Sequence, residues 1–211
     1  MTDSQNNVAH KKVILIHGMW MNTLSMRFIG GQLSKKGWQV IYYNYSSMFE
    51  TFDKNVAGLY QLWQKHQSPQ THLVAHSLGG LLILVMMKKY QLKNLPRTVL
   101  LSSPVKGSAV AKKMMASSIG RFFLGKSLQA LVTGEQYTAE NKIGIILGSR
   151  GIGIGHLIQK LPGPHDGVVA AEEASLENAE DKVILPVTHA TMLVSSKVVA
   201  AIDGYLKSGR F

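Results

Sequence analysis

The stretch Ala75-His76-Ser77-Leu78-Gly79-Gly80 joins two apolar runs of different length. The run before it, residues 72–76, is typical of a buried strand, and the run after it, residues 78–90, is long enough for a helix. A serine between them, with small residues two positions before and two positions after it, indicates a tight strand-to-helix turn that exposes the hydroxyl. A serine that only caps the helix is the plainer alternative.

Outward from this turn, short aliphatic runs alternate with longer amphipathic ones along most of the chain. We expect strands over residues 13–17, 39–45, 72–76, 98–102, 143–148 and 183–187. We expect helices over residues 24–36, 54–67, 78–90, 105–118, 126–132, 168–178 and 191–207. This alternation predicts an α/β fold with a mostly parallel central sheet of about six or more strands and helices on both faces. Ligands of such folds bind beyond the carboxyl ends of the strands.

The chain has 211 residues, of which 45% are hydrophobic and 17% are charged. This composition predicts a folded protein, and about 150 residues per domain favours a single domain. We place that domain at residues 13–211, after a flexible tail of residues 1–12, and find no insert long enough for a large cap domain. The polar start lacks a signal-peptide pattern, and the aliphatic run at residues 81–87 is too short to span a membrane. We therefore expect a cytoplasmic protein.

The formal net charge is +11, from 23 lysines and arginines against 12 aspartates and glutamates. The cations are scattered, so a solvated basic surface is the simplest interpretation, and a weak association with anionic membranes stays open. No stretch interleaves stacking aromatics with arginines, so we expect no nucleic-acid partner. The lack of cysteine excludes disulfides, thiolate metal sites and cysteine nucleophiles. We expect neither a metal nor a cofactor, and the sequence defines no oligomeric state.

Two later loops carry a base and an acid that could serve Ser77. His189 directly follows the last expected strand, and Asp166 follows the strand before it. A histidine can take the proton of a serine hydroxyl, and an aspartate can orient the imidazole and stabilise its cation. The alternatives are an ordinary loop histidine and a common Asp-Gly turn. Glu172 and Glu173 are the other acids that this region offers.

Residues 75–80 resemble the nucleophile elbow of the α/β-hydrolase superfamily, and the A-H-S-L-G-G form is similar to that of small bacterial lipases and esterases. The chain order Ser77, Asp166, His189 is also the order of that family. After the first expected strand, His17-Gly18-Met19 resembles the family's oxyanion loop.

The resemblance implies a serine hydrolase that cleaves carboxylic esters or thioesters through an acyl-enzyme on Ser77 and needs no cofactor. It also implies that the backbone N–H groups of Met19 and Leu78 bind the oxyanion. A small-molecule ester with an apolar acyl group is the expected substrate. Apolar side chains that could line an acyl pocket are Trp20, Met21, Phe122 and Phe123. Acyl transfer to another acceptor stays open, and so does a non-catalytic lipid- or ligand-binding protein on the same scaffold.

Two glycine-containing segments match nucleotide-binding patterns only in part. Residues 120–127 read G-x-x-x-x-G-K-S, the P-loop pattern, but the residues before them look helical instead of forming a strand. We interpret this segment as an apolar stretch with basic flanks near the mouth of the active site. Residues 148–155 lack the spacing of a dinucleotide-binding loop. We expect a long loop there that leads to Asp166.

Overall fold

Six parallel strands form one sheet in the computed structural model, which describes residues 11–133, 141–153 and 158–211. The strands are β1 (Lys12–Ile16), β2 (Gln39–Tyr43), β3 (Thr71–His76), β4 (Thr98–Leu101), β5 (Ile143–Gly148) and β6 (Asp181–Leu185). Their order across the sheet is β2-β1-β3-β4-β5-β6. Each expected strand is confirmed to within two residues at either end. Runs of valine, isoleucine and leucine mark the buried inner strands β1, β3, β4 and β5, whereas the edge strands β2 and β6 are only partly buried.

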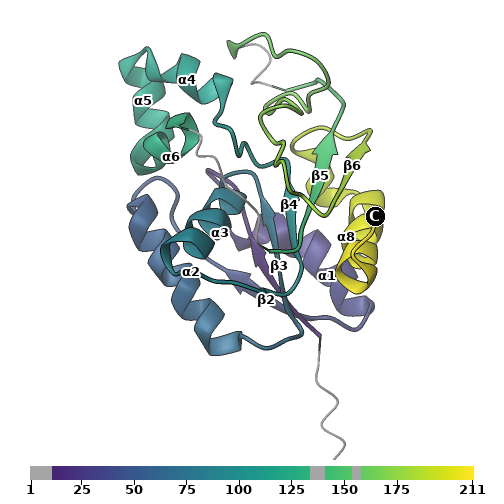
Figure 1. Ribbon diagram of the computed structural model, residues 1–211. Coiled ribbons are helices and arrows are strands. Elements are labelled where there is room, and N and C mark those ends of the chain that lie inside the picture. Colours follow the sequence, from purple (N-terminus) through teal and green to yellow (C-terminus); the bar gives the residue numbers. More distant parts are fainter. Residues whose placement is uncertain (1–10, 134–140, 154–157) are drawn as a thin grey trace, which may run out of the picture.

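Helices cover both faces of the sheet (Figure 1). α2 (Phe52–His66) and α3 (Leu78–Lys89) pack on one face, and α1 (Arg27–Lys35) and α8 (Ser196–Ser208) pack on the other. The short 3-10 helices η1 (Thr23–Met26) and η3 (Thr191–Val194) precede α1 and α8. Successive side chains of a strand point to opposite faces, so each central strand supplies both cores.

A third group of helices lies at the end of the molecule toward which β5 points (Figure 1). It consists of α4 (Ala109–Met115), α5 (Ser118–Leu124), η2 (Gly125–Ser127) and α6 (Leu128–Thr133). We call residues 104–133 the cap. The expected helix over residues 105–118 is shorter than predicted, because Ser117 is extended and caps the separate helix α5 by accepting the N–H of Gly120.

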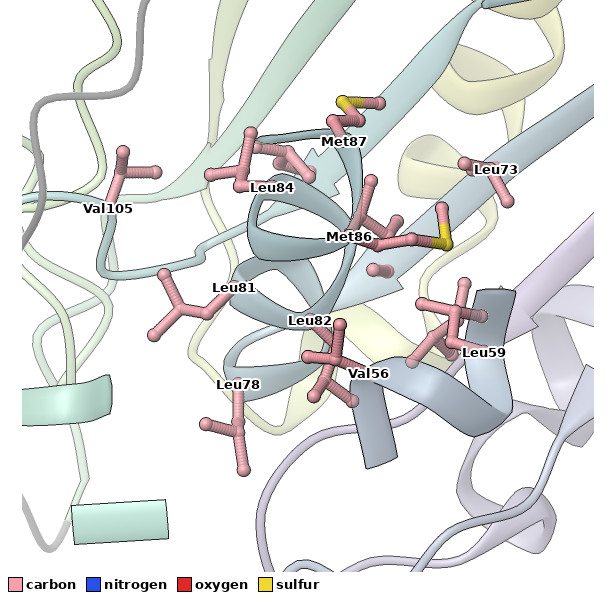
Figure 2. Close-up of a cluster of buried hydrophobic side chains, with 14 of the residues drawn as sticks. Val56, Leu59, Leu73, Leu78, Leu81, Leu82, Leu84, Met86, Met87 and Val105 are labelled. Carbon is pink, nitrogen blue, oxygen red and sulfur yellow. The ribbon is translucent and has the colours of Figure 1, made fainter. Parts of the chain in front are cut away.

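α3 is the most deeply buried helix of the described chain, with nine of its twelve residues inside. Figure 2 shows its leucines and methionines packed beside Val56 and Leu59 of α2 and near Leu73 of β3. A helix that is apolar on all sides is stable only when neighbours cover every side. Among the described residues, no helix is both long enough and apolar enough to cross a bilayer.

The expected helix over residues 168–178 is wrong, since this segment forms a series of turns. Glu173, which lies within this segment, connects it to the cap. The carbonyl of Glu173 accepts the N–H of Lys106 at 2.9 Å, and its carboxylate accepts the N–H groups of Ala109 at 2.6 Å and Ala170 at 2.9 Å. A helix would direct that carbonyl to its own next turn. At the Glu173 carbonyl, a contact with the cap therefore takes the place of a helical bond.

Truncation of a core leucine of α3 should destabilise the protein far more than truncation of an exposed leucine. Leu82 is fully buried and Leu24 is 66% exposed. Leu82→Ala should lower the free energy of unfolding by about 2–5 kcal/mol, because it leaves a cavity. Leu24→Ala should change it by less than about 0.5 kcal/mol. Equilibrium urea unfolding measures both, and equal effects would contradict this description of the core.

Candidate active site

Ser77 lies at the turn between β3 and α3 in a conformation that costs energy. Its φ is 52° and its ψ is −122°, a region that non-glycine residues rarely adopt. Such strain costs about 1–3 kcal/mol and persists only where the surroundings impose it. Here the Ser77 N–H donates to the carbonyl of Leu101 at 2.9 Å. Close packing adds to this constraint, because a Cβ on Gly79 would lie 2.5 Å from the carbonyl oxygen of His17.

His189 and Asp166, predicted as base and acid, are in direct contact. Nδ1 of His189 lies 2.7 Å from Oδ2 of Asp166. The other carboxylate oxygen accepts the N–H groups of Val168 and Val169 at 2.9 and 2.8 Å. The backbone is joined as well, since the His189 N–H donates to the Asp166 carbonyl at 2.9 Å. The acid therefore fixes both the imidazole ring and the loop that carries it.

Asp166 is completely buried, yet it stays ionised. Burial acts to raise the pKa of its carboxyl, but the hydrogen bonds from His189, Val169 and Val168 outweigh burial and hold that pKa below its ordinary value. An ionised carboxylate only accepts hydrogen bonds, so the proton in this contact belongs to Nδ1 of His189. In the neutral form of the ring, Nε2 then keeps its lone pair, as a general base requires.

Ser77 and His189 line one cavity of about 160 Å³. Trp20 and Met21, both predicted at this position, also line it. Most of the remaining wall is apolar. It includes side chains of the cap and of the loops on either side of Asp166, namely Val110, Ala111, Met114, Leu124, Leu131, Ile158, Val168 and Val169. A pocket of this chemistry accepts an apolar group next to the serine hydroxyl.

Two further predicted lining residues have a different outcome. The side chain of Phe122 is 72% exposed on α5 and lies away from this cavity, which corrects the prediction. The reason is helical spacing, because Gly120 and Leu124 form the buried side of α5 and direct Phe122 outward. The side chain of Phe123 lies outside the described part of the structure. Sequence reasoning missed Val168 and Val169, although their position directly after Asp166 was a usable signal.

His76, next to Ser77 in the chain, lies between the loop that carries His189 and the loop that carries Gly18. Its ring is fully buried, and Nε2 donates to the carbonyl of His189 at 3.1 Å. The ring centroids of these two histidines lie 4.5 Å apart. On the other side, a Cβ on Gly18 would lie 2.8 Å from Nδ1 of His76. Burial, together with the nearby His189, lowers the pKa of His76 to about 3, so the ring stays neutral. The sequence offered no signal for this contact.

The two N–H groups predicted for the oxyanion belong to Met19 and Leu78. Leu78 is the first residue of α3, so its N–H has no acceptor within the helix and stands at the positive end of the helix dipole. Met19 follows Gly18 and lines the cavity. The turn beyond it is fixed, since Trp20 has a φ of 59° and donates its N–H to Oγ of Ser47 at 2.9 Å.

The segment that matches the P-loop pattern has a structural role in the cap. Residues 120–127 lie within α5 and η2 and do not follow a strand. Oγ of Ser127 donates to the carbonyl of Ser47 at 2.8 Å. A Cβ on Gly125 would lie 3.0 Å from the carbonyl oxygen of Met48. The glycine and serine of the pattern therefore seat the cap against the loop after β2. Across the described residues, no three histidine, aspartate or glutamate side chains gather as a metal site would require.

Comparisons with known proteins establish the fold. No protein-family model matches the chain, and no curated protein matches its sequence. Solved structures match over nearly the whole chain. A Bacillus licheniformis lipase in mature form has a TM-score of 0.72 and 16% identity, with 98% of this chain and 95% of that one covered. A metagenomic carboxyl esterase has a TM-score of 0.71 and 13% identity, with 96% and 77% covered. A bromoperoxidase from Bacillus anthracis has a TM-score of 0.64 and 15% identity, with 94% and 92% covered. The chain has the α/β-hydrolase fold.

The buried neutral histidines should make the protein less stable as the pH falls below about 6.5. In the unfolded chain His76 binds a proton near that pH, whereas in the folded protein its pKa is about 3. The unfolded state therefore binds more protons in this window, and each such histidine should cost about 1.4 kcal/mol per pH unit.

We expect His76→Asn to remove close to one histidine's share of this slope between pH 4.5 and 6. His72, with a pKa of about 4 because of burial, lies at the other end of β3 and is the matched comparison. His72→Asn should remove a similar share, as measured by urea unfolding at a series of pH values. An unchanged slope in His76→Asn would contradict the neutral, buried state of that ring.

Proposed function

We propose that this protein is a serine hydrolase that cleaves carboxylic ester or thioester bonds through an acyl-enzyme on Ser77. The observation that carries the proposal is the 2.7 Å contact between His189 and Asp166 beside a cavity that Ser77 also lines. A strained serine, an imidazole oriented through its Nδ1 and a buried carboxylate are the groups that acyl transfer needs. Their convergence from three separate loops favours catalysis over a helix-capping serine.

In the proposed reaction, Oγ of Ser77 attacks the acyl carbonyl carbon while Nε2 of His189 takes the hydroxyl proton. Asp166 stabilises the imidazolium that forms. The N–H groups of Met19 and Leu78 donate to the oxyanion, and each such donor is worth about 2.7–4 kcal/mol in the transition state. The imidazolium then protonates the leaving alcohol or thiol. Water, deprotonated by the same ring, attacks the acyl-enzyme and releases the carboxylic acid together with the free serine.

The cavity supports a small apolar acyl group. Its volume of about 160 Å³ is below the range of about 300–1,000 Å³ that is typical for drug-sized ligands. Met114, Leu124 and Leu131 give it an apolar wall, on which a charged or strongly polar acyl group would lose hydration without compensation. We infer that short aliphatic acyl chains fit it best.

The structural neighbours agree with this proposal at the level of chemistry. They include a lipase, a carboxyl esterase and a pyrethroid hydrolase from Sphingobium faniae. Another neighbour is a bromoperoxidase, so the fold by itself does not select a reaction. The contacts at Ser77, His189 and Asp166 therefore carry the proposal.

A fluorophosphonate probe, followed by mass spectrometry of the modified peptide, tests the nucleophile. We expect labelling at Ser77, no labelling of Ser77→Ala and strongly slowed labelling of His189→Ala. The exposed Ser149 is the matched control, and Ser149→Ala should label like the parent protein. Hydrolysis should fall about 10,000-fold in Asp166→Asn, because the imidazole loses its orientation and its ion partner. A folded protein that resists the probe would favour the non-catalytic binding protein instead.

A series of nitrophenyl esters from acetyl to dodecanoyl tests the acyl pocket. We expect kcat/KM to peak at short chains, near four carbons, and to fall for longer ones. Met114→Ala should move the peak to longer chains by one or two carbons, since each buried methylene is worth about 0.8 kcal/mol. Its neighbour Met115 is 38% exposed and lies outside the lining, so Met115→Ala should leave the profile unchanged. Equal shifts in both variants would contradict the pocket.

A further inference from the structure

Helix α5 presents apolar side chains to solvent on the outside of the cap. Ile119 and Phe122 are one helical turn apart, and each is 72% exposed. Met115, at the end of α4, is 38% exposed. The Arg121 guanidinium joins the two helices by donating to the Met115 carbonyl at 2.9 Å. Single exposed apolar residues are common, but a group of them on one face indicates an interaction site.

The charge on this part of the chain has one sign. Residues 104–133 contain five cationic residues and no carboxylate, although the whole chain has 12 aspartates and glutamates. The five cationic residues are all exposed, and they are Lys106, Lys112, Lys113, Arg121 and Lys126. Lys112, Lys113 and Arg121 stand on the same two helices as the exposed apolar side chains. We call the set of Lys112, Lys113, Met115, Ile119, Arg121 and Phe122 the cap surface.

Carboxylates of neighbouring elements face other parts of the cap. Glu50, in the loop after β2, is close enough to Lys126 for that charge to lower the Glu50 pKa, although Lys54 is its main partner. Glu173 accepts the N–H of Ala109 at the start of α4. Both contacts are with residues outside the cap surface, so these two carboxylates of the described chain do not neutralise its cationic side chains.

The cap surface and the cavity wall lie on two sides of the same short helices. Met114 and Leu124 point into the cavity, whereas Met115 and Phe122 are exposed. Figure 1 shows α4 and α5 at the end of the molecule, beyond α2 and α3. The cap surface therefore lies at one end of the molecule, on the side of α4 and α5 away from the cavity.

We propose that the cap surface docks on an anionic lipid bilayer. Ile119 and Phe122 enter the boundary between headgroups and acyl chains, and Lys112, Lys113 and Arg121 contact anionic headgroups. A second copy of this chain fits poorly, because pairing two such surfaces would bring like charges together. The docking needs no catalysis, so it goes beyond the proposed hydrolase and can be tested apart from it.

The test is cosedimentation of the full chain with vesicles of phosphatidylcholine alone and with 30% phosphatidylglycerol. We expect binding to the anionic vesicles that weakens as salt is raised from 50 to 500 mM, and at least tenfold weaker binding to neutral vesicles. A basic residue near an anionic surface strengthens binding about fivefold. Lys112→Glu/Lys113→Glu should therefore weaken binding at least tenfold. Ile119→Ser/Phe122→Ser should also weaken it at least tenfold, because the inserted area is lost.

A matched control is Lys35→Glu/Lys197→Glu, which makes the same charge change at exposed positions of α1 and α8. This control should bind within about twofold of the parent, and so should Ser77→Ala. Unchanged circular dichroism and an unchanged midpoint of urea unfolding show that the cap variants are folded, and Lys112→Gln/Lys113→Gln is a milder second pair.

Three outcomes would overturn the proposal. The first is no binding of the parent protein to anionic vesicles. The second is an equal loss in the control pair, which would mean that net charge alone attracts the protein. The third is a loss on charge reversal with no effect of Ile119→Ser/Phe122→Ser, which would point to an acidic protein surface as the partner.

Discussion

The site depends on the burial of α3, because that burial keeps Ser77 in its strained turn. A serine with a φ of 52° relaxes unless both flanking elements are fixed. β3 is central in the sheet, and α3 is covered by the sheet, by α2 and by the start of the cap. The hydrophobic core on this face thus does more than stabilise the fold. It supplies the energy that keeps the Ser77 hydroxyl at the edge of the cavity.

The charge of the Asp166 carboxylate also depends on its buried surroundings. A buried carboxylate is unfavourable by itself, and three donors around Asp166 make its charge acceptable. These donors come from the backbone of its own loop and from His189. A neutral His76 then holds the carbonyl of His189, so the ring contact and the backbone contacts reinforce each other. The ring centroids of the two histidines lie 4.5 Å apart, and burial keeps the ring of His76 neutral.

Much of this arrangement could be predicted from the sequence, and there are physical reasons why the remaining features could not. The strands and the elbow are local patterns, so they were predictable within two residues, and the order of Ser77, Asp166 and His189 followed from strand ends. The turns at residues 168–178 were not predictable, because Glu173 bonds to Lys106 and Ala109 of the cap, which are distant in sequence. The outward direction of Phe122 likewise depends on which side of α5 meets the cavity, and that is decided by packing.

The three hydrogen bonds at Glu173 have a consequence for how such a protein can change over time. Glu173 connects the cap to the loop that carries Asp166, so we expect these two segments to move together. A cap taken from another chain would fit only if it offered N–H groups where those of Lys106 and Ala109 now stand. Insertions and deletions in the cap should therefore be rejected near the start of α4, and also around η2, where Ser127 donates to the carbonyl of Ser47. New ligand preferences of the cavity would arise by exchange of its side chains sooner than by replacement of the whole segment.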